Sequence, residues 1–166
     1  LPSAQVGDGR WGWCLVAILW SWSLIPSVPT GFRALDRFAP HLRHDPAARR
    51  YLRRFNTDIY GWLAPLGPGD KATLDGVYDA EVASQDEQVG QFVARLQAAG
   101  QLERTLLIVC ADHGDHLGEK QLVSHSFGAY NEVVRVPLII HDQGGDFPAG
   151  ATRDTPVSLR RVFHAS

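Results

Sequence analysis

Hydrophobic residues recur along the chain in two rhythms, and these rhythms predict where its helices and strands lie. Between residues 71 and 99, apolar side chains return every three or four positions, which is the spacing of one face of a long α-helix. Gly100 follows at the place where a left-handed residue often ends a helix. Continuous apolar runs at residues 14–20, 105–111 and 133–141 predict buried β-strands. A long helix combined with buried strands predicts an α/β fold.

Proline and glycine mark the boundaries of the shorter elements. Pro137 lies inside the last apolar run, so we expect that strand to begin late or to lie near a sheet edge. Asp45 and Pro46 predict the start of a short helix, because Asp is a good N-cap and Pro suits the first helical position. Residues 26–44, which contain three prolines and a glycine, are expected to form a loop.

The first apolar run is ambiguous. Residues 11–25 hold four of the five tryptophans of the chain. The run is about 15 residues long, short of the ~20 that a membrane-spanning helix needs, so no membrane span is expected. A buried strand is the plainest interpretation of this segment. A leader or membrane segment, or an unnatural end of the chain, are the alternatives.

Composition then narrows the class of protein. Lys and Arg total 16, and Asp and Glu total 18, so the net charge of −2 excludes a strongly basic nucleic-acid binder. Hydrophobic residues at 45% exclude wholesale disorder, and 166 residues suit one domain. Cys14 and Cys110 lie far apart among apolar neighbours, and we expect both thiols to be buried and unreactive. The chain has no Met and begins at Leu1, which favours a fragment of a longer protein.

Side chains able to bind a metal follow the predicted strand at 105–111. Asp112 and His113 stand at its carboxyl end, where α/β sheets bind ligands, and a carboxylate with an imidazole suits a divalent cation. Gly114 allows the backbone to turn sharply after them, and His125 lies in a glycine-rich loop able to fold back over the same strand end. The same loop contains further polar residues: Asp115, His116 and Glu119. From these residues alone, a purely structural role for Asp112 and His113 stays open.

An ordered series of short motifs runs from residue 78 to residue 141. It comprises Tyr78, Asp79, Glu81, Asp86, Gly90, Asp112, His113, Gly114, Gly118, Glu119, His125, Tyr130, Arg135, Val136 and Pro137. This series resembles the sulfatase family of the alkaline phosphatase superfamily. The resemblance implies an α/β fold, part of an alkaline-phosphatase-like sandwich with a mostly parallel sheet flanked by helices. It also implies that residues 1–166 form one incomplete domain, in which residues 71–141 match the family most strongly and residues 1–40 are uncertain.

The resemblance also implies a site and a reaction. Asp112 and His113 would be two ligands of one divalent metal, Ca2+ first, with Mn2+ or Zn2+ as alternatives. His125 would be catalytic, contacting the sulfate or the leaving oxygen of a small-molecule or glycan sulfate ester. Tyr130 and Arg135 would be structural and guide the loop into the next strand. The expected function is therefore that of a sulfuric ester hydrolase.

The sequence departs from the family pattern in two places. It contains neither the C/S-x-P-S-R motif that supplies the nucleophile nor a pair of adjacent aspartates that would complete the metal site. We therefore expect this chain alone to be inactive. Two alternatives remain open: a phosphonate or phosphate ester hydrolase or phosphoryl transferase of the same superfamily, and a non-catalytic truncated pseudoenzyme. Nothing in the sequence indicates a compartment or an oligomeric state.

Overall fold

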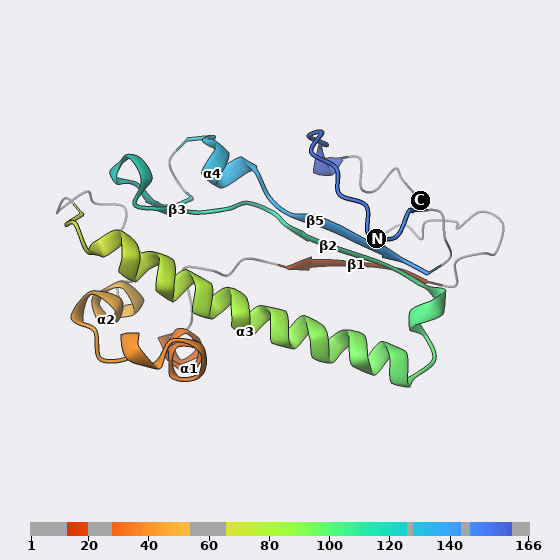
Figure 1. The fold of residues 1–166 in the computed structure, drawn as a ribbon, viewed down its shortest axis with the longest axis horizontal. Coiled ribbons are helices and arrows are strands. Elements are labelled where there is room, and N and C mark those ends of the chain that lie inside the picture. Colours follow the sequence, from red (N-terminus) through yellow and green to blue (C-terminus); the bar gives the residue numbers. More distant parts are fainter. Residues whose placement is uncertain (1–12, 20–27, 54–65, 126–127, 144–146, 161–166) are drawn as a thin grey trace.

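The fold is taken from a computed structural model that describes residues 13–19, 28–53, 66–125, 128–143 and 147–160 (Figure 1). The strands are β1 (Trp13–Leu19), β2 (Thr105–Ala111), β3 (His116–Leu117), β4 (Val123–Ser124) and β5 (Leu138–Asp142). The α-helices are α1 (Val28–Phe38), α2 (Pro46–Arg53), α3 (Asp70–Ala98) and α4 (Asn131–Val134). Short 3-10 turns occupy Pro40–Leu42, Leu102–Arg104 and Glu119–Gln121.

The largest described sheet has the strand order β1-β2-β5. β1 lies parallel to β2, in a register that pairs Trp13 with Thr105. β5 lies antiparallel to β2 on its other side, in a register that pairs Leu106 with Asp142. β3 and β4 form a separate antiparallel hairpin. In the described residues the sheet thus has one parallel and one antiparallel pairing, and the expected predominance of parallel pairs stays a prediction.

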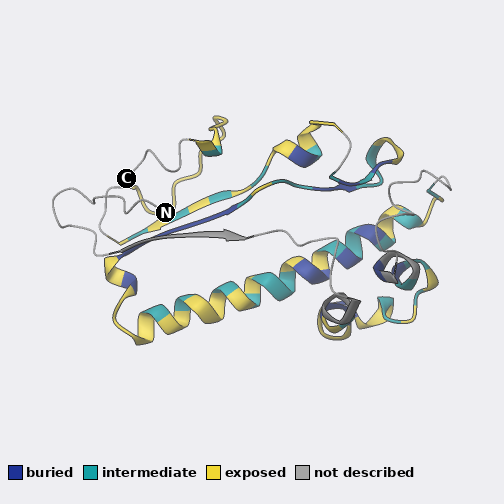
Figure 2. Ribbon diagram, turned by 180° about the vertical axis from the view of Figure 1, so that it is seen from behind, coloured by how far each residue is buried: buried dark blue, intermediate teal, exposed yellow. Residues whose placement is uncertain are grey.

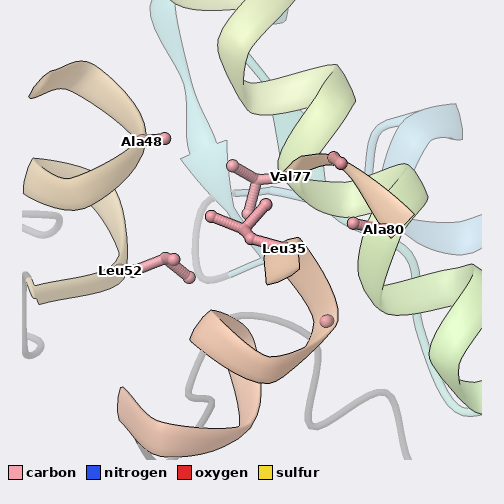
Figure 3. Packing of buried hydrophobic residues seen from close by; sticks show 7 residues of the cluster. Leu35, Ala48, Leu52, Val77 and Ala80 are labelled. Carbon is pink, nitrogen blue, oxygen red and sulfur yellow. The ribbon is translucent and has the colours of Figure 1, made fainter. Parts of the chain in front are cut away.

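A hydrophobic core joins the three longer helices. α3 runs along the strands, and α1 and α2 lie on its far side (Figure 1). Leu35 of α1 and Val77 of α3 are completely buried where these helices meet, and Ala48 and Leu52 of α2 are buried in the same cluster (Figure 3). This packing fixes the first half of α3, which also carries side chains of the candidate site.

The second half of α3 is less covered. The apolar face predicted for the whole helix is buried at Leu74 and Val77, whereas Val82 and Phe92 are exposed. Figure 2 displays this change along the helix, from buried positions beside α1 and α2 to exposed positions toward its C-terminal end. None of the described helices combines the length and apolarity that crossing a bilayer requires.

Several predicted elements are confirmed. The long helix, the strand at 105–111 and the short helix that begins at Pro46 are all present. The backbone amide of Ala48 donates to Asp45 Oδ1 at 2.9 Å, so Asp45 caps that helix as expected. Gly100 ends α3 with a φ of +62°. The first apolar run forms β1, although Trp20 and the rest of that run lie outside the described residues.

Two predictions are wrong. Residues 26–44 are not a loop throughout, because α1 occupies most of the described part. Pro29 falls in the first turn of α1, where its missing N–H costs no hydrogen bond, and Ala34 and Leu35 gain burial against α3. The strand predicted at 133–141 begins only at Leu138, after Pro137 as expected, while its first residues belong to α4.

Candidate active site

The turn that follows β2 is fixed by a close approach between two backbone segments. The Gly114 amide donates to the Val133 carbonyl at 2.7 Å. A Cβ atom on Gly114 would lie 2.2 Å from the carbonyl oxygen of Glu132, a distance that no real contact allows. Only glycine therefore fits at this position, and the turn carrying Asp112 and His113 is tied to α4.

The hairpin beyond this turn is anchored to the start of α3. Glu119 accepts a hydrogen bond from Lys71 Nζ at 2.9 Å and another from the Leu117 amide at 2.7 Å. Burial by itself would raise the pKa of Glu119, but these hydrogen bonds and the charge of Lys71 outweigh it, so the pKa is lowered. Gly118 turns the chain with a φ of +106° beside Leu74 of α3. The loop is thereby held against the helix by an ionised carboxylate.

The same loop contains backbone strain. Lys120, Gln121 and Ser124 have φ angles of 56°, 60° and 77°. Non-glycine residues pay about 1 kcal/mol or more for such left-handed conformations, and these clusters occur at functional sites. Ser124 directly precedes His125, so the strained backbone helps to set where that imidazole lies.

Of the three predicted site residues, His113 and His125 come together at the carboxyl end of β2, and Asp112 contacts His113. The rings of His113 and His125 lie with centroids 3.9 Å apart and planes tilted by 30°. Asp112 Oδ1 accepts a hydrogen bond from the His113 amide at 3.0 Å and lies 3.8 Å from His113 Nε2. His113 Nδ1 is 3.0 Å from the Gly114 carbonyl, which indicates that Nδ1 carries the proton and Nε2 is left to accept or to bind a metal.

A fourth residue, Asp115, belongs to the site more closely than the sequence indicated. Its side chain is 0% exposed, and Oδ1 lies 3.0 Å from His125 Nδ1. The register of the hairpin explains the contact: His116 pairs with Ser124, so the preceding and following residues face each other at its open end. From the sequence, Asp115 is only one polar residue among several, because the register of so short a hairpin leaves no hydrophobic pattern to detect.

The donor set fits a divalent cation. His113, Asp115 and His125 each offer one ligand atom, and these atoms lie within 4.8 Å of one another. Two imidazoles with a carboxylate are ligands that Zn2+ and Mn2+ accept readily, whereas Ca2+ prefers an all-oxygen shell. Asp112 lies outside this trio, and its Oδ1 atom is 3.8 Å from His113 Nε2, so among the three it is placed to share an ion with His113.

Behind the site, α3 contributes a buried acidic group. Glu81 is buried, and burial together with the charge of Asp115 raises its pKa to about 8. Burial first, and then the nearby charges of Asp115, Asp79 and Glu81, also raise the pKa of Tyr78. Within the described part of the chain, Glu81 Oε1 and both ring nitrogens of His116 are buried without a hydrogen-bond partner.

Comparison with known proteins gives one family. The sulfatase family model matches residues 37–165. A multifunctional alkaline phosphatase superfamily protein, PehA of Trinickia caryophylli, is 29% identical over 128 residues, which cover 74% of this chain and 24% of that protein. An arylsulfatase of Volvox carteri is 43% identical over 94 residues, covering 53% of this chain and 14% of the relative. An ulvan-active sulfatase of Formosa agariphila is 27% identical over 146 residues, which cover 81% of this chain and 27% of that protein. No solved structure matches the chain.

The chain therefore belongs to the sulfatase family, within the alkaline phosphatase superfamily. This family has an alkaline-phosphatase-like α/β fold and contains hydrolases of sulfate esters, and the resemblance stated from the motifs is confirmed. The aligned part of the chain spans between 14% and 27% of these relatives.

Proposed function

We propose that this chain contributes the metal-binding and proton-donating half of an active site that hydrolyses sulfate esters. The observation that carries the proposal is the meeting of His113 and His125 at the end of β2, inside the segment matched by the sulfatase family. Both rings are partly exposed, so a substrate has access to them. A metal-dependent hydrolase can use such a meeting of a metal ligand and a proton donor at one reacting group.

Asp112 and His113 are the proposed ligands of the metal, which neutralises charge on the sulfate oxygens when it is bound. The Asp112 carboxylate and the His113 Nε2 atom are 3.8 Å apart. The family resemblance makes Ca2+ the first candidate, while an imidazole ligand favours Mn2+ or Zn2+.

His125 is proposed to act on the leaving group. Its Nδ1 faces Asp115, which leaves Nε2 as the atom that meets a substrate. A proton or a hydrogen bond supplied there would offset the negative charge that builds up on the departing alkoxide. The substrate is proposed to be a small-molecule or glycan sulfate ester, in keeping with the names of the arylsulfatase and the ulvan-active sulfatase.

Residues 1–166 are further proposed to be one incomplete sulfatase-like domain, whose complete sheet is mostly parallel. The sequence contains no C/S-x-P-S-R motif and no adjacent aspartates, so we propose that the chain alone binds metal but does not turn over substrate.

A second candidate is hydrolysis of phosphonate or phosphate esters, or phosphoryl transfer. It is favoured by the relative named as a multifunctional member of the alkaline phosphatase superfamily. The third candidate, a non-catalytic pseudoenzyme, predicts no specific metal site at all.

Calorimetric titration of the 166-residue chain with Ca2+, Mn2+ and Zn2+ tests the metal site. Stoichiometric binding is expected, weakened tenfold or more in Asp112→Asn and in His113→Ala. His44→Ala and Asp154→Asn are matched controls, because both residues are exposed and lie outside the site, and they are expected to bind as the wild type does. Absence of binding, or equal binding by all variants, would contradict the proposal and favour the pseudoenzyme.

A further inference from the structure

We propose that Asp115 is a positioning residue that holds His125 as the Nδ1–H tautomer and thereby presents Nε2 to the substrate. The inference deepens the proposed function and rests on the role given there to His125. Its own basis is the geometry of one hydrogen bond and the burial of one carboxylate.

The hydrogen bond has an ordinary length, and its two partners have very different surroundings. Asp115 Oδ1 lies 3.0 Å from His125 Nδ1. The Asp115 side chain is 0% exposed, whereas the His125 side chain is 34% exposed. The carboxylate therefore forms the inner end of the pair and the imidazole the outer end, so the imidazole alone meets solvent or substrate.

The chemistry of the carboxylate decides which way the hydrogen bond runs. An ionised carboxylate only accepts hydrogen bonds, so His125 must carry its proton on Nδ1 to donate it. The alternative tautomer would turn a lone pair of Nδ1 toward a buried negative charge, which is a repulsive arrangement. The second polar atom near Nδ1 is the Ser124 hydroxyl at 3.4 Å, which is farther away and uncharged.

The consequence concerns the other ring nitrogen. With its proton held on Nδ1, the neutral imidazole of His125 has a lone pair on Nε2, and in its protonated form Nε2–H is the proton available for transfer. In either form of the ring, the Asp115 carboxylate accepts the hydrogen bond from Nδ1, so Nε2 stays the outward-facing nitrogen. Asp115 itself does not contact substrate and acts only through His125.

The fold also restricts the imidazole ring. His125 lies against the His113 ring with centroids 3.9 Å apart, and its backbone follows the strained residue Ser124. The hairpin that brings Asp115 opposite His125 is tied to α3 through Glu119 and Lys71. On a hairpin anchored to α3 in this way, one hydrogen bond is enough to select both the tautomer and the direction of the ring.

The tautomer can be read directly in the 166-residue chain by long-range proton–nitrogen NMR correlation. The chain is labelled with ¹⁵N-histidine, and His125 is assigned from the signal lost in His125→Gln. The spectrum is recorded at a series of rising pH values, and the tautomer is read where the ring-nitrogen shifts of His125 no longer change with pH. The expected result is a His125 ring with Nδ1 protonated. A His125 ring with Nε2 protonated would overturn the proposal.

Substitution separates Asp115 from its neighbours. Asp115→Ala is expected to shift His125 to the Nε2–H tautomer, whereas Ser124→Ala and the exposed control Asp154→Asn are expected to leave the tautomer unchanged. If Asp115→Ala does not fold, Asp115→Asn is used, and the Nδ1 proton resonance is expected to move upfield because a neutral amide is a weaker acceptor. An unchanged His125 signal in the folded Asp115 variant would overturn the proposal.

The two proposals fail separately. If no sulfate ester is hydrolysed but His125 carries its proton on Nδ1 through Asp115, the proposed function falls and the positioning role of Asp115 stands. Where turnover is measured on the product of the complete reading frame, Asp115→Asn is expected to lower kcat about 10²-fold or more with little change in KM. A loss confined to KM would contradict the positioning role.

Discussion

Gly114 and Val133 are joined by a 2.7 Å hydrogen bond between their backbones, and this contact leaves no room for a side chain at residue 114. A methyl group there would meet the Glu132 carbonyl at 2.2 Å, so the two segments would have to separate. We predict that Gly114→Ala lowers the free energy of unfolding by about 2–3 kcal/mol. Urea unfolding followed by circular dichroism measures this.

Gly90 provides the matched control for that prediction. It lies within α3, and a Cβ atom built on it meets no other atom within 4 Å. Gly90→Ala is therefore expected to raise the free energy of unfolding by about 0.5–1 kcal/mol, because alanine is the better helix former. Equal effects of the two substitutions would mean that the close approach at Gly114 is not a constraint.

The stability of the chain is predicted to fall as the pH rises from about 5 to about 8. Burial and the charge of Asp115 raise the pKa of Glu81 to about 8, above its ordinary value of 4.5. Between these two values the folded chain holds a proton on Glu81 that the unfolded chain has lost, so raising the pH favours unfolding, by up to a few kcal/mol. Urea unfolding at a series of pH values measures the slope.

Two variants test whether Glu81 causes this dependence of the free energy of unfolding on pH. Glu81→Gln cannot ionise and is expected to flatten the pH dependence and to be more stable than the wild type above about pH 8. Asp115→Asn removes the negative charge near Glu81 and is expected to reduce the slope partially. If the slope is the same in Glu81→Gln and in the wild type, another group is responsible.

The thiol of Cys110 is predicted to be slow to react in the folded chain. Cys110 is buried in β2, and burial, with a further contribution from the charge of Asp112, raises the pKa of its thiol. In a Cys14→Ser variant, reaction with Ellman's reagent is expected to be at least tenfold slower in buffer than in urea. Equal rates in both conditions would show that β2 opens readily.

Metal binding is predicted to stabilise the fold. An ion that binds only the folded chain raises the free energy of unfolding, by about 2.7 kcal/mol at a concentration one hundred times the Kd. The thermal midpoint is therefore expected to rise when the preferred ion is added, and to fall back when a chelator removes it. In His113→Ala the ion is expected to have little effect, whereas in His44→Ala the full shift should persist.

Hydrophobic periodicity predicted the elements whose apolar residues are regularly spaced and are also buried in the fold. The helix at 70–98 and the strand at 105–111 carry strong rhythms, and both are present. α1 was missed because Pro29 and Gly31 suggest a loop when its burial against Val77 is not known. Tertiary packing outweighed local propensity there.

The candidate site was predictable in part for a similar reason. Asp112 and His113 follow a buried strand directly, so their position at a sheet end could be inferred from the sequence. The partnership of Asp115 with His125 depends on the register of a hairpin of two-residue strands, which no hydrophobic alternation specifies. The effect of the Asp115 charge on the pKa of Glu81 could not be predicted either, because Glu81 lies on α3 and Asp115 in a loop far along the chain.

The central claim is tested most directly by hydrolysis of 4-nitrophenyl sulfate, beside 4-nitrophenyl phosphate, by the product of the complete reading frame that contains these residues. With the preferred metal present, the account predicts that the sulfate ester is the better substrate and that Asp112→Asn loses about 10²-fold or more of its turnover, while Asp154→Asn keeps it. A preference for the phosphate ester, or full activity in Asp112→Asn, would contradict the account.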